Sequence, residues 1–236
     1  MFYKKINLNF VVKDLLYLTI CGIFLMSIPS YANNNLNSDI ISETQYKLVS
    51  KKHFINDFVP INENGTVNVV IEIPSGTLEK WEISNISGDI LWGFKNGKPR
   101  KVQYLGYPFN YGAIPRTLLS INDGGDGDPL DAILIGPPFK RGEIKSGKVV
   151  GVLKLIDDGE KDDKILIVHP SSPLYKVKDI NNLISNFPGV LTIIEIWFGN
   201  YKGMGVIKTN GYDNKKNAMF ILSSAIRSFQ NHQLKK

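Results

Sequence analysis

The sequence around residue 130 reads Asp126-Gly127-Asp128-Pro129-Leu130-Asp131 and runs directly into the apolar segment Ala132-Ile133-Leu134-Ile135. Three carboxylates therefore lie within six residues, immediately before a predicted strand. Unpaired like charges this close repel, so without compensation one carboxylate would be protonated or the loop would be pushed open. A hard divalent cation such as Mg²⁺, which prefers oxygen ligands, removes this difficulty. The alternative is an acidic turn exposed to water, because Asp and Gly are ordinary turn residues.

A second acidic segment reads Asp157-Asp158-Gly159-Glu160-Lys161-Asp162-Asp163 and joins two predicted strands, residues 148–156 and 164–168. A hairpin at this place brings Asp157 and Asp162 close together, although a solvated turn again explains the composition. Other side chains could contact phosphate oxygens. They are Lys80 beside Glu82, Lys164, Tyr107, Tyr111, and the pair Tyr201-Lys202. Each signal is weak by itself, because a Lys is usually solvated and a Tyr usually packs.

The segments around these motifs predict strands first and helices later. Apolar residues alternate over residues 66–73, which predicts a strand, and residues 78–83 predict another. Apolar residues recur every three or four positions in residues 180–201 and 217–232, which predicts helices, with a turn at Pro188-Gly189 before the first helix proper. This order favours an α+β domain built on a small barrel or sheet.

The N-terminal segment has the layout of a secretory signal peptide. Lys4 and Lys5 precede an apolar run over residues 15–28, and Ser30-Tyr31-Ala32 offers small residues before a cut after residue 32. The prediction is therefore a signal peptide at residues 1–32, a linker at 33–52 and a domain at 53–236. The protein would be periplasmic or secreted, with membrane contact only through this segment, or cytoplasmic if the segment is not an export signal. An uncleaved anchor is the further alternative.

The composition excludes a disordered chain but selects no ligand. The chain has 236 residues, of which 43% are hydrophobic, too many for a disordered polypeptide. Its formal net charge of +6 is a weak excess that suits nucleic acid, anionic lipid or a polyanionic small molecule.

The motifs, taken in order, closely resemble the soluble family I inorganic pyrophosphatases. The segment 126–131 is similar to that family's signature Asp-x-Asp-Pro-x-Asp, and the similarity extends from about Ile55 to the C-terminus. The matching stretches are Val70-Ile71-Glu72-Ile73-Pro74, Lys80-Trp81-Glu82, residues 107–112, Val150-Gly151-Val152-Leu153-Lys154, Asp157, Asp162, Lys164 and Tyr201-Lys202. The resemblance implies a five-stranded OB-type β-barrel with flanking C-terminal helices. It also implies an inorganic diphosphatase that hydrolyses pyrophosphate to two phosphates with several Mg²⁺ ions per site.

The resemblance also implies roles for individual residues. Asp126, Asp131 and Asp162 would hold the principal Mg²⁺, Asp157 with Asp162 would bind a further ion, and Glu72 would assist another. Asp128 would be the base toward the nucleophilic water. Phosphate oxygens would be held by Lys80, Tyr111, Lys164, Tyr201 and Lys202, with Glu82 and Tyr107 in support. The family's phosphate-binding Arg aligns with residues 98–103 in an uncertain register; we assign it to Arg100, with Lys101 as the alternative.

Two other classes of protein compete with this interpretation. OB barrels often bind single-stranded nucleic acid through aromatic side chains on a basic groove, but here the diagnostic positions are acidic, so we expect no nucleic-acid partner. A metal-binding member of the same fold with weakened catalysis is the second alternative. The family resemblance further implies a homo-oligomer, although no interface can be identified in the sequence.

Overall fold

The computed structural model describes residues 39–235. The predicted signal peptide, residues 1–32, lies outside them. Within the described part of the chain, no helix is both long enough and apolar enough to cross a membrane.

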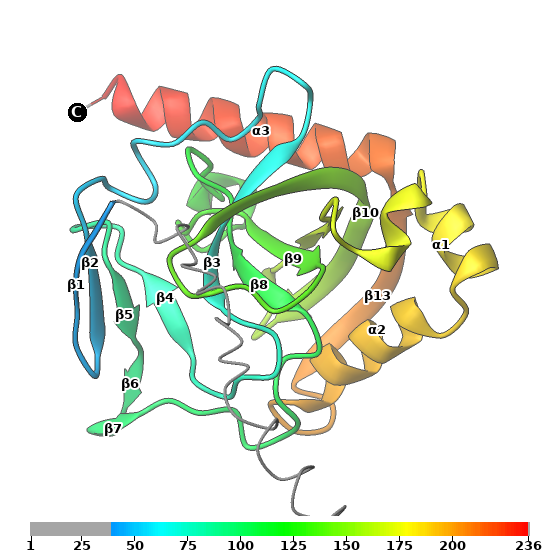
Figure 1. Cartoon of the computed structure of the whole chain (residues 1–236), viewed down its shortest axis with the longest axis horizontal. Helices are drawn as coiled ribbons and strands as arrows, with labels where there is room; N and C mark the ends of the chain where they lie inside the picture. The colour runs from blue at the N-terminus through cyan, green and yellow to red at the C-terminus, as the bar shows by residue number, and fades with distance from the viewer. Residues whose placement is uncertain (1–38, 236) are drawn as a thin grey trace, which may run out of the picture. The chain divides into compact units, whose positions relative to one another are not determined.

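Five strands close into a ring. In order around it they are β3 (Val67–Ile73), β8 (Asn110–Ala113), β9 (Asp131–Ile135), β12 (Lys164–Val168) and β10 (Ile144–Asp157). The ring closes because β10 is 14 residues long: its first residues pair with β3, whereas its later residues pair with β12. Two further strands, β11 (Glu160–Lys161) and β13 (Ile207–Asn214), pair with β10 outside the ring. The predicted five-stranded barrel is thereby confirmed, and Figure 1 shows β10 curving past β8 and β9.

Close backbone packing is needed where β8 meets β3. A Cβ at Gly112 would lie 1.8 Å from the carbonyl oxygen of Val70, a distance that no side chain can occupy. Glycine at this position therefore allows the two strands to pair beside Tyr111, whose side chain enters the site described below.

Among residues 39–235, three helices follow the barrel strands. They are α1 (Ile180–Asn186), α2 (Val190–Asn200) and α3 (Lys215–Gln233), with two short 3-10 turns at Ile121–Asp123 and Pro173–Lys176. Helices were predicted in both regions, 180–201 and 217–232, but the segment before Pro188-Gly189 forms a helix of its own where only a turn was expected. The predicted break at Pro188-Gly189 is present, and Gly189 there has a positive φ of 89°. Helix α3 packs on β10 and β12, whereas α2 packs on β13, so the helices cover two faces (Figure 1). The fold class is α+β, as expected.

A smaller sheet lies beside the barrel. Its order is β1 (Ile40–Glu43), β2 (Lys47–Ser50), β5 (Ile90–Trp92) and β4 (Trp81–Ile83), and a separate hairpin joins β6 (Phe94–Lys95) to β7 (Lys98–Pro99). Strands β1 and β2 occupy residues for which the sequence predicted a linker. Only tertiary contacts explain them. Leu48 is 2% exposed in a core with Phe54 and Ile90, and β2 pairs with β5 through Leu48 and Ile90, which are 42 residues apart in sequence.

Candidate active site

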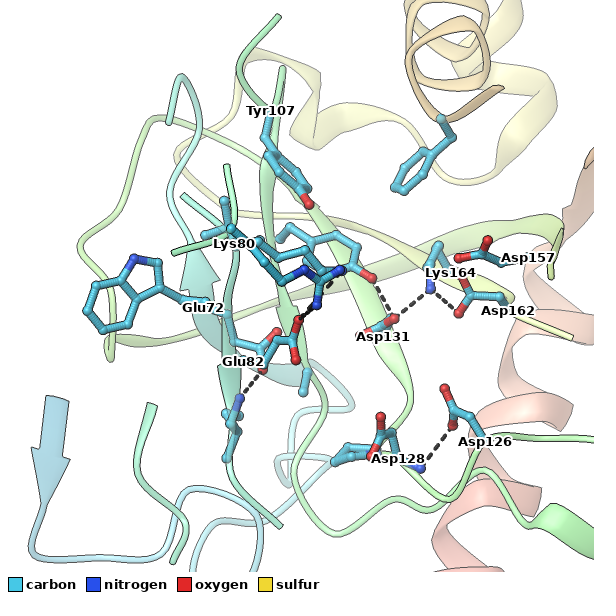
Figure 2. Close-up of a pocket in the computed structure, with 18 of the residues that line it drawn as sticks. Glu72, Lys80, Glu82, Tyr107, Asp126, Asp128, Asp131, Asp157, Asp162 and Lys164 are labelled. Atoms are coloured by element: carbon cyan, nitrogen blue, oxygen red, sulfur yellow. Dashed lines mark hydrogen bonds and ion pairs between the residues drawn. The ribbon is translucent and has the colours of Figure 1, made fainter. Parts of the chain in front are cut away.

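One cavity of about 350 Å³ gathers nearly all of the side chains that the sequence singled out. Its lining comes from β3, β4, β8, β9, the β10–β12 hairpin and the end of α2 (Figure 2). Of the predicted site residues, only Lys202 is absent from this lining; it lies in an adjoining groove. The lining includes Glu72, Lys80, Glu82, Arg100, Tyr107, Tyr111, Asp126, Asp128, Asp131, Asp157, Asp162, Lys164 and Tyr201.

Strand periodicity explains why the charged ends of β9 and β12 share one side. Successive side chains of a strand point to opposite faces. Ala132 on β9 and Ile165 on β12 belong to the core under α3, so their predecessors Asp131 and Lys164 face away from α3. The two strands are parallel with Ile165 beside Ala132, which places Lys164 next to Asp131.

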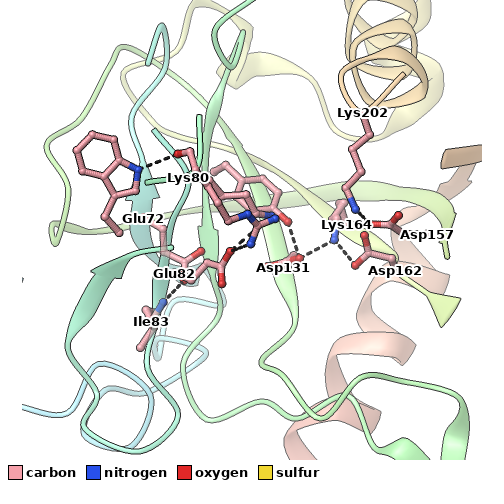
Figure 3. Close-up of polar contacts among 12 residues, drawn as sticks. Glu72, Lys80, Glu82, Ile83, Asp131, Asp157, Asp162, Lys164 and Lys202 are labelled. Carbon is pink, nitrogen blue, oxygen red and sulfur yellow. Dashed lines mark hydrogen bonds and ion pairs between the residues drawn. The ribbon is translucent and has the colours of Figure 1, made fainter. Parts of the chain in front are cut away.

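Lys164 lies between two carboxylates. Its side chain is 3% exposed, its Nζ is 2.5 Å from Asp131 Oδ2, and it also pairs with Asp162 Oδ1 (Figure 3). Burial opposes the charged form of Lys164, but Asp131 and Asp162 outweigh burial and raise the pKa of the ammonium. Tyr111 donates its hydroxyl to the same Asp131 oxygen at 2.5 Å. Asp131 is therefore held in place by two donors from different strands.

A second ion pair lies at the end of β10, where the acidic hairpin begins. Lys202 Nζ pairs with Asp157 Oδ2 (Figure 3), whereas Asp157 Oδ1 is buried and has no hydrogen-bond partner among the described residues. Asp157 and Asp162 line the same cavity, as the predicted hairpin required. Asp157 Oδ1 is therefore a buried carboxylate oxygen that is free to accept a hydrogen bond or to bind a cation.

Glu72 is fixed deep in the cavity wall. It is 6% exposed, and one of its side-chain oxygens accepts a hydrogen bond from the backbone amide of Ile83 at 2.7 Å. Burial, followed by the nearby charge of Asp131, raises the pKa of the Glu72 carboxyl well above its usual range. Arg141 supports this segment from behind: its Nε donates to the Glu72 carbonyl at 3.0 Å and its guanidinium lies 4.0 Å from the Trp81 ring centroid.

Arg100 and Lys101, the two candidates for the family's arginine, lie in different places in the structure. Arg100 lines the cavity, and its Nη1 is 2.7 Å from Glu82 Oε1. Its backbone is secured because Trp92 Nε1 donates to the Arg100 carbonyl at 2.7 Å. Lys101 instead places its Nζ over the Trp92 ring, 5.4 Å from the centroid. Of the two candidates for the family's arginine position, Arg100 lines the acidic cavity and Lys101 does not.

The loop before β9 carries Asp126 and Asp128, which lie together in Figure 2. Asp126 Oδ1 accepts a hydrogen bond from the Asp128 backbone amide at 2.9 Å. Partial burial raises the pKa of both carboxyl groups. Sequence reasoning missed Asn85, whose Nδ2 donates to Asp128 Oδ1 at 2.7 Å. No motif marks Asn85, because it is 43 residues from Asp128 and its loop meets the acidic loop only in the folded chain.

The donor set of the cavity fits hard divalent cations. Nine acidic residues line it against four cationic ones, Lys80, Arg100, Lys161 and Lys164. Among residues 39–235, however, no three acidic or histidine side chains already converge in a ligand geometry. Lys164 and Lys202 pair with the carboxylates that would have to converge. Carboxylate oxygens in excess, one of them buried without a partner, are what Mg²⁺-like ions prefer.

A closed five-stranded barrel with a carboxylate-rich cavity bordered by Lys, Arg and Tyr suits the class of hydrolases that cleave phosphate anhydrides. The chain belongs to the inorganic pyrophosphatase family, whose sequence model, described as "Pyrophosphatase: Inorganic pyrophosphatase", matches residues 69–230. The predicted family is thus confirmed.

Known relatives resemble the chain in sequence and in structure. It is 36% identical over 209 residues to the mitochondrial inorganic pyrophosphatase of Saccharomyces cerevisiae, and the match covers 75% of this chain and 67% of that protein. It is 37% identical to the Candida albicans inorganic pyrophosphatase, covering 72% and 64% of the two chains. The chain therefore spans about two thirds of the length of these relatives. The type I inorganic pyrophosphatase of Toxoplasma gondii superposes with a TM-score of 0.74 at 25% identity, covering 81% of this chain and 97% of that chain.

Proposed function

We propose that this protein hydrolyses inorganic pyrophosphate to two phosphates with the help of divalent cations, most directly Mg²⁺. The observation that carries the proposal is one cavity in which carboxylates from four chain segments meet Lys, Arg and Tyr side chains. Its family membership points to the same reaction. An OB module for nucleic acid suits this cavity poorly, because nine acidic side chains would repel a polyanion in the absence of metal.

Pyrophosphate carries up to four negative charges, so it repels both a carboxylate-lined wall and an approaching hydroxide. Divalent cations, when bound, lower the pKa of a water molecule and neutralise the phosphate charge. Asp126, Asp131 and Asp162 would hold the principal ion, with Asp157 and Glu72 as donors to others. The ion pair of Lys164 with Asp131 and Asp162 holds these two carboxylates adjacent, in the place where the principal ion would bind.

The protein's own side chains supply the remaining steps. Asp128 would take the proton of the attacking water through Oδ2, since Asn85 binds its Oδ1. Lys80, Arg100, Tyr201 and Lys202 would hold the phosphate oxygens and stabilise the charge on the leaving phosphate. Arg100 and Lys80 both lie close to Glu82, at 2.7 and 3.8 Å, so Glu82 orients the two cations.

Phosphate release from pyrophosphate by the purified full chain tests the proposal. We expect rapid release with Mg²⁺, and loss of that release when a chelator removes the metal, because the cavity cannot bind a tetra-anion while its carboxylates are uncompensated. Restoring Mg²⁺ should restore the rate. Binding of Mg²⁺ without any hydrolysis would instead identify a metal-binding protein that retains the fold and has lost catalysis.

Asn85 provides a sharper test of the role of Asp128. Replacing Asn85 with alanine should lower kcat by about tenfold while KM changes little, because a base that loses its orienting hydrogen bond is misplaced toward the water. Steady-state kinetics with pyrophosphate measure kcat and KM separately. Asn64, whose Oδ1 accepts hydrogen bonds from Thr66 and which does not line the cavity, is the matched control. A raised KM at unchanged kcat would show that Asn85 contacts substrate and does not act through Asp128.

We further propose that residues 1–32 direct export and that the mature protein forms a homo-oligomer. The charged start, apolar run and small residues before position 33 support export. N-terminal sequencing of protein from cells tests it: a chain that starts at Asn33 supports export, and one that starts at Met1 opposes it. Light scattering of the purified protein measures the number of subunits.

A further inference from the structure

Strand β4 and the residue before it supply two charged side chains of the cavity, although β4 is not a barrel strand. Trp81, the first residue of β4, is flanked by Lys80 and Glu82, and all three line the cavity. Within residues 39–235, β4 pairs with β5 alone, and no strand pairing joins it to β3, the barrel strand that it contacts. Side chains must therefore hold β4 in its place beside β3.

Glu72 and Arg141 join the two strands. Glu72 on β3 accepts a hydrogen bond from the backbone amide of Ile83 on β4 at 2.7 Å (Figure 3). Arg141 lies in the turn before β10; its Nε donates to the Glu72 carbonyl at 3.0 Å, and the central carbon of its guanidinium lies 4.0 Å from the Trp81 ring centroid. One guanidinium thus binds the backbone of β3 and an aromatic ring of β4 at the same time.

The position of the Trp81 ring depends on contacts with its faces. Trp81 is 4% exposed, yet its Nε1 has no hydrogen-bond partner in the described part of the chain. Its ring stacks on Trp92, with 5.5 Å between centroids and 19° between planes. Arg141 is half-buried and forms no ion pair with any residue in the range 39–235, so the negative face of the Trp81 ring attracts its charge without a competing carboxylate contact. The contact with Arg141 therefore supplies the polar attraction that fixes this ring.

The same stack of rings reaches Arg100. Trp92 Nε1 donates to the Arg100 carbonyl at 2.7 Å, and the backbone amide of Lys80 donates to that carbonyl at 3.0 Å. A shift of Trp81 would therefore move Lys80 and Arg100 together. The metal-binding carboxylate of Asp131 would stay in place, because β9 is paired with both β8 and β12.

We propose that Arg141 is a positioning residue for the phosphate-binding side chains. By joining β3 to the stacked rings of Trp81 and Trp92, it fixes β4 relative to the barrel. It thereby sets the distance from Lys80 and Arg100 to the carboxylates of the cavity. Arg141 itself does not line the cavity, so it acts through these side chains. This inference rests on the proposed pyrophosphate hydrolysis.

The variant Arg141→Met tests the inference, because it keeps an unbranched side chain but removes the cation and the N–H donor. We expect kcat/KM for pyrophosphate to fall about tenfold, mostly through a higher KM, since small displacements of binding groups are costly. Isothermal titration should show about tenfold weaker binding of methylenediphosphonate, a pyrophosphate analogue that cannot be hydrolysed at its bridge. The affinity for Mg²⁺ alone should not change, because its proposed ligands lie outside β4.

Arg116 is the matched control for a purely structural effect. It is also half-buried, its Nε also donates to a backbone carbonyl, that of Asn56 at 2.8 Å, and it does not line the acidic cavity. Arg116→Met should lower the free energy of unfolding in urea, as Arg141→Met should, because each leaves a carbonyl without its donor. Its KM and its affinity for methylenediphosphonate should stay at the wild-type values. An equal rise of KM in both variants would mean that Arg141 contributes only to stability, and the inference would be wrong.

Trp92→Phe tests the path from Arg141 to Arg100. Phenylalanine keeps an aromatic ring beside Trp81 but removes the donor to the Arg100 carbonyl, so this variant should also have a higher KM. If the two substitutions displace the same segment, the double variant Arg141→Met/Trp92→Phe should lose less than the product of the two single losses. Losses that multiply would show that the two residues act independently and would overturn the proposed path.

The binding measurements separate this inference from the proposed function. If the wild type releases no phosphate from pyrophosphate, the proposed function fails, but titration with methylenediphosphonate still tests Arg141. If Arg141→Met binds the analogue as tightly as the wild type, the inference is wrong. If Arg141→Met does not fold, Arg141→Lys replaces it: lysine keeps the charge but lacks the planar group that stacks and donates at once. It should show a smaller rise in KM, and an unchanged KM would contradict the inference.

Discussion

Replacing Asp131 with asparagine should lower kcat for pyrophosphate hydrolysis by more than about 10³-fold. Loss of one oxyanion-stabilising donor in other enzymes costs about 10² to 10³, and Asp131 has more than one role. Its Oδ2 contacts both Tyr111 and Lys164, and in the proposed mechanism its carboxylate is a ligand of the principal ion. Asparagine has the same shape but no charge, so the loss reports on charge and metal affinity.

Two measurements make the Asp131 result interpretable. Isothermal titration with Mg²⁺ should show weaker binding in the variant, because a neutral amide is a poorer ligand for a hard cation. The exposed Glu63, changed to glutamine, is the control and should keep full activity. A variant at position 131 that keeps a tenth or more of the activity would remove Asp131 from the centre of the site.

Replacing Lys164 with methionine should destabilise the metal-free protein by about 3 kcal/mol, the loss expected when one partner of a buried ion pair is removed. The change leaves Asp131 and Asp162 close together without the cation that now lies between them. Urea unfolding in the presence of a chelator measures this loss. Added Mg²⁺ should recover much of it, because binding to the folded state alone stabilises that state.

Lys154 offers a matched control for this experiment. Its Nζ pairs with Asp163, whose side chain is 5% exposed, but neither residue lines the acidic cavity. Lys154→Met should therefore also destabilise the protein, without a specific recovery by Mg²⁺. If Mg²⁺ restored the free energy of unfolding equally in both variants, or did not restore it in Lys164→Met, the ammonium of Lys164 would not lie where a divalent cation binds.

The strands and helices that were predicted could be identified because their apolar periods are local. Residues 164–168 were predicted as a strand and form β12, and the helix break predicted at Pro188-Gly189 is present. A period of two or of 3.6 residues reflects one buried face, which leaves its mark within a few residues of sequence. The hairpin at residues 40–50 left no such mark, because Leu48 is its only deeply buried residue and its partner strand is distant.

The relation between charged groups was not predictable in the same way. The sequence named Asp131, Asp162 and Lys164 as ligands and phosphate contacts, but not that Lys164 lies between the two carboxylates. The sequence did not indicate that Asn85 contacts Asp128, or that Lys95 and Lys98 lie opposite each other in the β6–β7 hairpin. Such relations depend on strand register and loop placement, to which residues far apart in sequence contribute.

The order of motifs was enough to determine the family, because composition and spacing are properties of the chain itself. The family resemblance then implied the barrel and the set of candidate site residues. Tertiary structure alone decided which of those charged side chains form ion pairs with one another. It places the cavity lined by nine acidic side chains beside a groove lined by Lys80, Lys95, Lys98, Arg100, Lys101 and Lys202. Only the folded barrel sets the distances over which like charges repel and opposite charges pair.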